Sequence, residues 1–173
     1  MRRRAAAVTL LEQNEKLGKK LFITGKGRCN LTNASDMEQL FANVVSNRKF
    51  LYSAFYSYDN EQVISFFESH GMPTKTERGN RVFPVSDHSS DVIAALSTAL
   101  RGQHVEVLLH TKVNRLLLEK RDEEKRVTGV ELADHTKMHA DAVIVATGGI
   151  SYPSTGATGD GYRMAEESGH KMV

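Results

Sequence analysis

The feature that most constrains the fold is a pair of short apolar runs, each of which ends beside acidic or glycine-rich residues. The first run, 5–11, ends at Glu12, and the second, 141–146, continues into Thr147-Gly148-Gly149. Continuous apolar runs of this length are typical of strands buried on both faces of a parallel sheet. Helical and hairpin patterns lie between the two runs, so the order of elements predicts an α/β fold with an antiparallel insert.

Periodicity, capping residues and turn residues predict the intervening elements. Helices are expected over 15–22, 36–41, 48–58, from Asp59 or Asn60 to Gly71, from Ser89 or Ser90 to Gly102, and over 160–169. A hairpin is expected over 75–83 with its turn at 78–80, and a buried strand over 104–109. Strands over 112–118 and 126–132, with a second turn at 134–136, predict a β-meander.

A glycine-rich run, 24–33, follows the first predicted strand after one short helix. Gly25 and Gly27 allow the backbone to approach a flat or charged ligand closely. Two cations, Lys26 and Arg28, and the only cysteine, Cys29, lie beside these glycines. Because open α/β sheets bind ligands outside the carboxyl ends of their strands, the run is a candidate cofactor-binding loop.

A dinucleotide-binding fold usually opens with G-x-G-x-x-G, followed about 20 residues later by an acid that binds the ribose hydroxyls. Glu12 stands where that acid is expected, but no G-x-G-x-x-G occurs in the chain. We therefore expect the chain to start inside the first helix of such a fold, with 2–4 at the end of that helix. A strand-end acid that faces water explains Glu12 equally well.

Composition argues against several classes of protein. The net charge is +2, and the basic cluster at 2–4 has no interleaved aromatic residues, so no nucleic-acid partner is expected. No apolar stretch approaches the ~20 residues of a membrane helix, so no membrane association is expected. A single cysteine excludes an internal disulfide and fits a reducing, cytoplasmic setting. The histidines show no metal spacing, and neither G-x-S-x-G nor a P-loop occurs.

Two long segments, 17–33 and 146–162, resemble the signatures of a family of bacterial flavoproteins. These are described as NAD(P)/FAD-dependent oxidoreductases, and also as aminoacetone oxidase-like or bile-acid-reductase-like. The resemblance covers essentially the whole chain. It implies a partial FAD-binding Rossmann-like domain of the glutathione-reductase type over 1–173, with a helical and hairpin insert at about 34–88 and a β-meander at about 111–140. Family members are much longer, so the chain is expected to be a fragment that lacks the first strand and its glycine loop.

The resemblance also implies residue roles. Glu12 would hold the ribose hydroxyls of the adenosine half of FAD, because a carboxylate accepts two hydrogen bonds from a diol. Either Lys19 or Lys20 would contact the pyrophosphate or ribose, with a solvated helix face as the alternative. Val113 would contact adenine through its backbone, with plain strand packing as the alternative. The residues that would turn the chain sharply beside the cofactor are Thr147, Gly148 and Gly149.

The flavin end would be lined by Thr24, Gly25, Gly27, Arg28, Cys29 and Asn30. Arg28 is expected to offset negative charge on a reduced flavin or a substrate acid. Cys29 is interpreted as a small residue packed beside the flavin, in preference to a redox thiol. No catalytic acid or base is predicted.

The predicted function is that of an FAD-binding oxidoreductase, linked to NAD(P)H and acting on a small molecule. The alternative is a truncated, non-catalytic fragment of such a flavoprotein that binds little or no flavin alone. The sequence does not predict the substrate, the choice between NADH and NADPH, or the oligomeric state.

Overall fold

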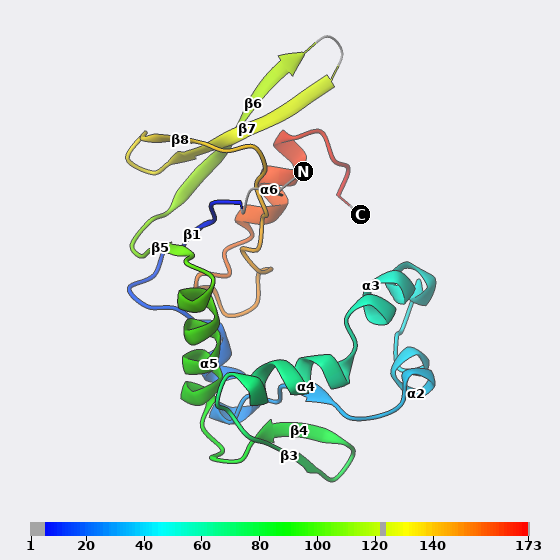
Figure 1. Cartoon of the computed structure of the whole chain (residues 1–173). Coiled ribbons are helices and arrows are strands. Elements are labelled where there is room, and N and C mark those ends of the chain that lie inside the picture. Colours follow the sequence, from blue (N-terminus) through cyan, green and yellow to red (C-terminus); the bar gives the residue numbers. More distant parts are fainter. Residues whose placement is uncertain (1–5, 122–123, 173) are drawn as a thin grey trace, which may run out of the picture. The chain divides into compact units, whose positions relative to one another are not determined.

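The structure is a computed structural model that describes residues 6–121 and 124–172, shown in Figure 1. The chain divides into two compact units. Unit 1 combines Met1–Lys20 with Val105–Val173, and unit 2 is the continuous stretch Leu21–His104. The predicted insert at about 34–88 lies within the sequence of unit 2, and its status as a separate insert stays a prediction.

Unit 1 contains a parallel pair of strands, β1 (Thr9–Leu11) and β5 (Glu106–Leu108). Leu10 lies opposite Val107, and beyond the strand ends the Glu12 amide donates to the Leu108 carbonyl at 2.9 Å. Parallel neighbours need a long crossover connection. Here the connecting chain includes all of unit 2.

The second sheet of unit 1 is antiparallel, with the strand order β6-β7-β8. Its strands are β6 (Val113–Arg121), β7 (Glu124–Leu132) and β8 (Lys137–His139). These strands occupy the region of the predicted meander. Gly129 of β7 lies opposite His139, and a Cβ at Gly129 would lie 2.1 Å from the Met138 carbonyl oxygen. A side chain at this position would therefore separate β7 from β8.

The strand predicted over 141–146 is wrong. Residues 141–149 form no strand, and Ile144 is 91% exposed. An apolar run becomes a buried strand only where a neighbouring strand satisfies its backbone and another layer covers its side chains. Within the described chain β1 and β5 pair only with each other, so this run has no such neighbour. Unit 1 ends with a 3-10 turn, η3 (Pro153–Thr155), and the helix α6 (Asp160–Glu167).

Unit 2 is a helical segment packed with a small antiparallel sheet of order β2-β4-β3. The helix α1 (Lys19–Ile23) begins in unit 1 and continues into unit 2. The helical elements that follow are η1 (Thr24–Gly27), α2 (Met37–Ala42), η2 (Arg48–Leu51), α3 (Tyr52–Ser57), α4 (Asn60–Ser69) and α5 (Ser89–Gly102). The strands are β2 (Thr32–Asn33), β3 (Thr74–Glu77) and β4 (Arg81–Pro84).

Local sequence signals account for these elements. Asp59 caps α4 in a capping box with Gln62, as Asp and Gln at this spacing favour. The hairpin turns at the predicted residues, where Gly79 and Asn80 both have positive φ. The strand β2 was not predicted, because its two residues become a strand only by pairing with β4.

The core of unit 2 forms between α4, α5 and the loop that follows α1. Its buried members are Cys29, Phe67, Met72, Val92 and Ala95. Val92 and Ala95 lie on one face of α5, at the spacing that an amphipathic helix presents to a core. None of the described helices is long and apolar enough to span a membrane.

Candidate functional site

The residues predicted to bind the cofactor fall into two groups, one in each unit. Those in unit 1 are Glu12, Lys19, Lys20, Val113, Thr147, Gly148 and Gly149. Those in unit 2 are Thr24, Gly25, Gly27, Arg28, Cys29 and Asn30. The roles assigned to them stay predictions, and the structure shows what each residue contacts in its own unit.

Glu12 follows β1 directly and is half-buried. Its Oε1 accepts hydrogen bonds from the Asn14 backbone amide at 2.8 Å and from Asn14 Nδ2 at 2.7 Å. Over residues 6–121 and 124–172 no hydrogen bond reaches the second oxygen, Oε2. The carboxylate is thus oriented through one oxygen and keeps acceptor capacity on the other.

The segment around Glu12 contacts the second sequence signature within unit 1. Gln13 Nε2 donates to the Gly156 carbonyl at 2.8 Å, and Asn14 Nδ2 donates to the Thr155 carbonyl at 3.1 Å. Gly156 has φ +96°, and a Cβ there would lie 2.8 Å from Gln13 Nε2. Residues separated by about 140 positions in the chain therefore meet at the carboxyl end of β1.

The two lysines of α1 differ in their contacts. Lys20 Nζ donates to the Ser151 carbonyl at 3.0 Å and lies 4.4 Å from the centre of the Tyr152 ring. Lys19 pairs instead with Glu15 one helical turn earlier, at 3.2 Å. Lys20 is therefore the lysine that the fold places against the second signature.

The Thr147-Gly148-Gly149 segment turns beside the start of α6. Gly148 has φ +72°, and the Gly149 carbonyl accepts from the Gly159 amide at 3.1 Å. A Cβ on Gly161 would lie 2.6 Å from Thr147 Oγ1, so the turn and α6 approach closely. Val113, by contrast, begins β6 opposite Leu132, where its backbone belongs to the sheet.

The first glycine-rich loop folds back on itself in unit 2. The Cys29 amide donates to the Thr24 carbonyl at 3.1 Å, and Gly25, Gly27 and Cys29 all have positive φ. A Cβ on Gly25 would lie 2.7 Å from the Asn30 backbone nitrogen. The loop therefore requires glycine at position 25 for space as well as for conformation.

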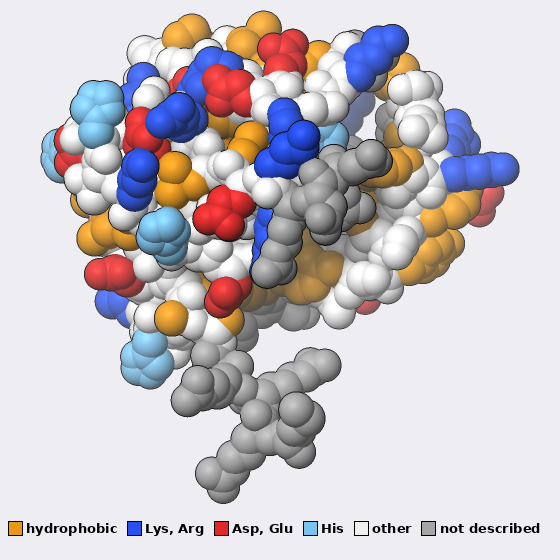
Figure 2. All heavy atoms as spheres, turned by 90° about the horizontal axis from the view of Figure 1, so that it is seen from above, with side chains coloured by type: hydrophobic (Ala, Val, Ile, Leu, Met, Phe, Trp, Pro, Cys, Tyr) orange, Lys and Arg blue, Asp and Glu red, His pale blue; other side chains and the backbone are white. Residues whose placement is uncertain are grey.

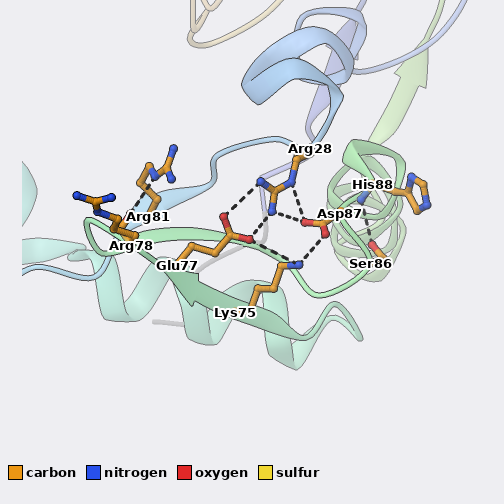
Figure 3. Close-up of polar contacts among 8 residues, drawn as sticks. All are labelled: Arg28, Lys75, Glu77, Arg78, Arg81, Ser86, Asp87 and His88. Atoms are coloured by element: carbon orange, nitrogen blue, oxygen red, sulfur yellow. Dashed lines mark hydrogen bonds and ion pairs between the residues drawn. The ribbon is translucent and has the colours of Figure 1, made fainter.

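Arg28 is the charged centre of this loop, and Figure 3 shows it pointing between two carboxylates. Arg28 Nε donates to Asp87 Oδ1 at 2.8 Å, and Nη1 donates to Glu77 Oε2 at 3.3 Å. Lys75 Nζ donates to the other oxygen of Asp87 at 2.7 Å. The guanidinium carbon also lies 4.2 Å from the centre of the buried Phe83 ring. Two cations and two anions thus form one cluster with no net charge.

The cluster shifts the ionisation of its members. The hydrogen bond from Arg28 holds the pKa of Glu77 below its usual value. Hydrogen bonds from Lys75 and then Arg28 lower the pKa of Asp87, and the carboxylates of Glu77 and Asp87 raise the pKa of Arg28. The ionised forms therefore favour one another.

Sequence reasoning missed Lys75, Glu77 and Asp87. Lys75 and Glu77 are two apart on β3 and so share one face of the strand, which was the only available signal. Nothing in the sequence pairs them with Arg28, which is 49 residues from Glu77 and 59 from Asp87. In the described part of the chain no group of three or more His, Cys, Asp or Glu residues could hold a metal ion.

Comparison with known proteins gives relatives over nearly the full chain. The chain is 34% identical over 167 residues to the 3-dehydro-bile acid delta(4,6)-reductase of Clostridium scindens, which covers 96% of this chain and 39% of that protein. It is 29% identical over 168 residues to the ribosomal RNA dihydrouridine synthase of Haemophilus influenzae, with 96% and 40% covered. The chain thus spans about two fifths of the length of these relatives.

The comparisons also identify the fold and the family. The crystal structure of THI4 from Thermovibrio ammonificans aligns with a TM-score of 0.55 at 14% identity, over 95% of this chain and 54% of that one. At this identity the likeness shows the fold alone, and it confirms the predicted partial Rossmann-like α/β class. Residues 1–173 match the family described as the HI0933-like protein Rossmann domain. The chain therefore belongs to the HI0933-like Rossmann domain family, which confirms the predicted resemblance to a bile-acid-reductase-like family of proteins.

Proposed function

We propose that this chain is the FAD-binding part of a reductase that adds two hydrogens across a carbon–carbon double bond, with NAD(P)H as the reductant. The names of two relatives support the reaction. One is a delta(4,6)-reductase of a bile acid and the other makes dihydrouridine in ribosomal RNA, so both names describe saturation of a double bond. Since their substrates differ, the shared element is the reaction.

The observation that carries the proposal is the arrangement at the end of β1. Glu12 lies at the carboxyl end of a parallel strand, where nucleotides bind in open α/β sheets. Its Oε2, which accepts no hydrogen bond from residues 6–121 or 124–172, suits a ribose hydroxyl, because a carboxylate oxygen accepts hydrogen bonds without a competing donor. Lys20 is the cation that would serve the pyrophosphate. The chemistry of this donor set fits FAD.

The remaining residues would position the cofactor. The turn at Thr147-Gly148-Gly149 would bring backbone close to it, and the Val113 backbone would meet adenine. Bound FAD would supply hydride transfer, while the chain's own residues bind and orient it. The Gly25 loop would line the flavin.

The substrate we propose is a small molecule, and the setting we propose is the cytoplasm. On the face shown in Figure 2, cationic and anionic side chains are interspersed. Among the described residues of this face, the distribution offers no continuous basic track for a phosphate backbone.

A second candidate is a non-catalytic chain that binds flavin weakly by itself. Ile144, Ile150 and Tyr152 of unit 1 are exposed, although large apolar side chains favour burial. With these side chains uncovered, the turn at 147–149 would be held less firmly than in a chain that buries them. Weak FAD binding by a chain whose unit 2 is stably folded would favour this second candidate.

Titration of the purified chain with FAD, followed by quenching of flavin fluorescence, tests the proposal. We expect Glu12→Gln to weaken FAD binding about tenfold or more, because the amide keeps one acceptor oxygen and loses the charge. Glu15→Gln is the matched control, since Glu15 lies three residues away and its carboxylate pairs with Lys19 at 3.2 Å. Equal affinity in the two variants would contradict the role of Glu12.

The reaction is tested by anaerobic addition of NADH or NADPH to the flavin-loaded chain. Loss of the oxidised flavin absorbance would show reduction. Recovery of that absorbance with an unsaturated steroid ketone, and no recovery with uridine-containing RNA, is the expected result. If only RNA restores the oxidised flavin absorbance, the substrate is RNA and the proposed small-molecule substrate is wrong. If NAD(P)H reduces the flavin and neither compound restores the absorbance, the result counts against the double-bond reaction.

A further inference from the structure

We propose that Arg28 is a positioning residue, which locks the loop 24–30 through Glu77 and Asp87 instead of lending its charge to a ligand. This inference rests on the proposed function, in which that loop lines the flavin. In place of the expected role of Arg28 as a cation that faces the ligand, Arg28 fixes the conformation of the loop.

The first argument is that every nitrogen of the guanidinium donates to a carboxylate. Nε and Nη2 donate to Asp87, and Nη1 and Nη2 donate to Glu77. One face of the planar group also covers the ring of Phe83 at 4.2 Å. Arginine suits such a place because its planar fork matches two carboxylates and stacks on an aromatic ring. No nitrogen of Arg28 is left without a carboxylate partner.

The second argument is that the backbones of Glu77 and Asp87 are themselves held by hydrogen bonds in unit 2. Glu77 lies in β3, opposite Arg81 of β4. The Asp87 amide donates to the Pro84 carbonyl at 3.1 Å, in the turn that leads into α5. Lys75 Nζ lies 2.7 Å from Asp87 and 3.7 Å from Glu77, so it holds the two anions together. Arg28 thus ties the loop to a hairpin distant in the chain.

The third argument is that the loop holds a conformation that needs support. Cys29 has φ +57°, which is uncommon for a residue with a side chain, yet it is only 3% exposed. The Leu31 amide donates to the Val82 carbonyl at 2.8 Å, which holds the far end of the loop. Residues in sparsely populated backbone regions persist only where the surroundings over-determine them. Arg28 is the neighbouring side chain that supplies this support.

Alkylation of Cys29 by iodoacetamide tests the lock without flavin. Cys29 is the only cysteine, so the modified fraction reports this loop alone. We expect Arg28→Lys, Glu77→Gln and Asp87→Asn each to raise the rate about tenfold, the size typical of residues coupled through shared contacts. Arg28→Lys is decisive because it keeps the charge and loses the fork.

Arg81→Gln is the matched control for these variants. Arg81 lies over the same Phe83 ring at 5.7 Å but donates to the Arg78 carbonyl and forms no ion pair in the described contacts. We expect its alkylation rate to equal that of the wild type. Urea unfolding of each variant separates local opening from global unfolding. An unchanged rate in Arg28→Lys would overturn the proposal.

A double-mutant cycle on FAD affinity gives the second test. If Arg28 acts through Asp87, the double variant Arg28→Lys/Asp87→Asn binds FAD as tightly as whichever single variant has lost more affinity. Additive losses would show that Arg28 acts on the ligand directly and would overturn the proposal. A wild-type chain that binds no FAD would defeat the proposed function, while the Cys29 rates would still decide whether the lock exists.

Discussion

The two glycine-rich signatures of this chain fold into different kinds of structure. The first, around Gly25, is closed by its own backbone, contains a buried core residue in Cys29, and is tied to a hairpin by Arg28. The second, from Thr147 to Gly156, leaves Ile150 and Tyr152 exposed. Its carbonyls accept hydrogen bonds from the Gln13 and Asn14 side-chain amides and from Lys20, and its own backbone adds further bonds, such as that from the Gly159 amide to the Gly149 carbonyl.

The difference shows what a glycine-rich segment needs in order to be closely packed. The first loop follows α1, places Cys29 in the core of unit 2, and is joined to β4 by the hydrogen bond from the Leu31 amide to the Val82 carbonyl. The second follows an apolar run that has no paired strand in the described chain. Positive φ angles occur in both segments, so glycine permits the turn in each case. Packing and pairing with the rest of the unit decide how firmly the turn is held.

The largest expected effect is that of Gly25→Ala. The new Cβ would lie 2.7 Å from the Asn30 nitrogen at a φ of +56°. Because the obstacle is backbone, we expect a loss of about 3 kcal/mol or more in the free energy of unfolding. Gly27→Ala is the control, since it has φ +85° and open space around it. It should cost only about 1 kcal/mol, the conformational part. Equal losses by urea denaturation would show that the first loop is not tightly closed.

Gly156→Ala makes the corresponding change in the second signature. Its Cβ would lie 2.8 Å from Gln13 Nε2 and 2.9 Å from Asn14 Nδ2, which are the ends of side chains that can move. We therefore expect a loss of about 2 kcal/mol, smaller than for Gly25→Ala. The same denaturation experiment measures it. A larger loss than that of Gly25→Ala would reverse the comparison between the two segments.

Acid should make the two segments more alike, because it removes the charges that tie the first loop to Glu77 and Asp87. Because the folded-state pKa values of Glu77 and Asp87 lie below their usual values, their stabilisation is present above the usual values and is lost as the pH falls through the lowered ones. Wild type should therefore exceed Asp87→Asn in unfolding free energy at pH 7. The gap should close in the acid range. A gap that does not shrink as the pH falls below the usual carboxylate range would show that the carboxylate charge is not what holds the loop.

Lys20→Met is expected to have the smallest effect. It removes one hydrogen bond to Ser151 and one cation–ring contact with Tyr152, both near solvent. We expect a loss of about 0.5 kcal/mol. Since no carboxylate takes part in these contacts, the loss should be the same at pH 7 and in acid. A loss that grows or vanishes with pH would reveal an ionisable partner in the second segment.

Much of the local structure could be predicted from the sequence. The helix α5, the hairpin of β3 and β4, and the capping of α4 by Asp59 follow the expected positions closely. Each depends on residues within one or two turns of one another, so periodicity and capping suffice. The strand predicted at 141–146 failed because a strand also depends on a neighbour, which no local pattern supplies.

The candidate site divides in the same way. The sequence identified Glu12 and the glycine loop by type and order. It could not show that Lys20, and not Lys19, meets the second signature, because α1 places them on different sides. Nor could it show that the charge of Arg28 is balanced, since Glu77 and Asp87 lie beside it only in the folded chain.

By itself, the sequence determined the family and the approximate positions of α5, of the β3–β4 hairpin and of the cap of α4. These properties depend on residue type and on short spacing along the chain. Only the tertiary structure decided which strand has a partner, that Cys29 lies in a core, and that Arg28 is locked between two anions. Such contacts join residues tens of positions apart, and their energies depend on distances that only the folded chain sets.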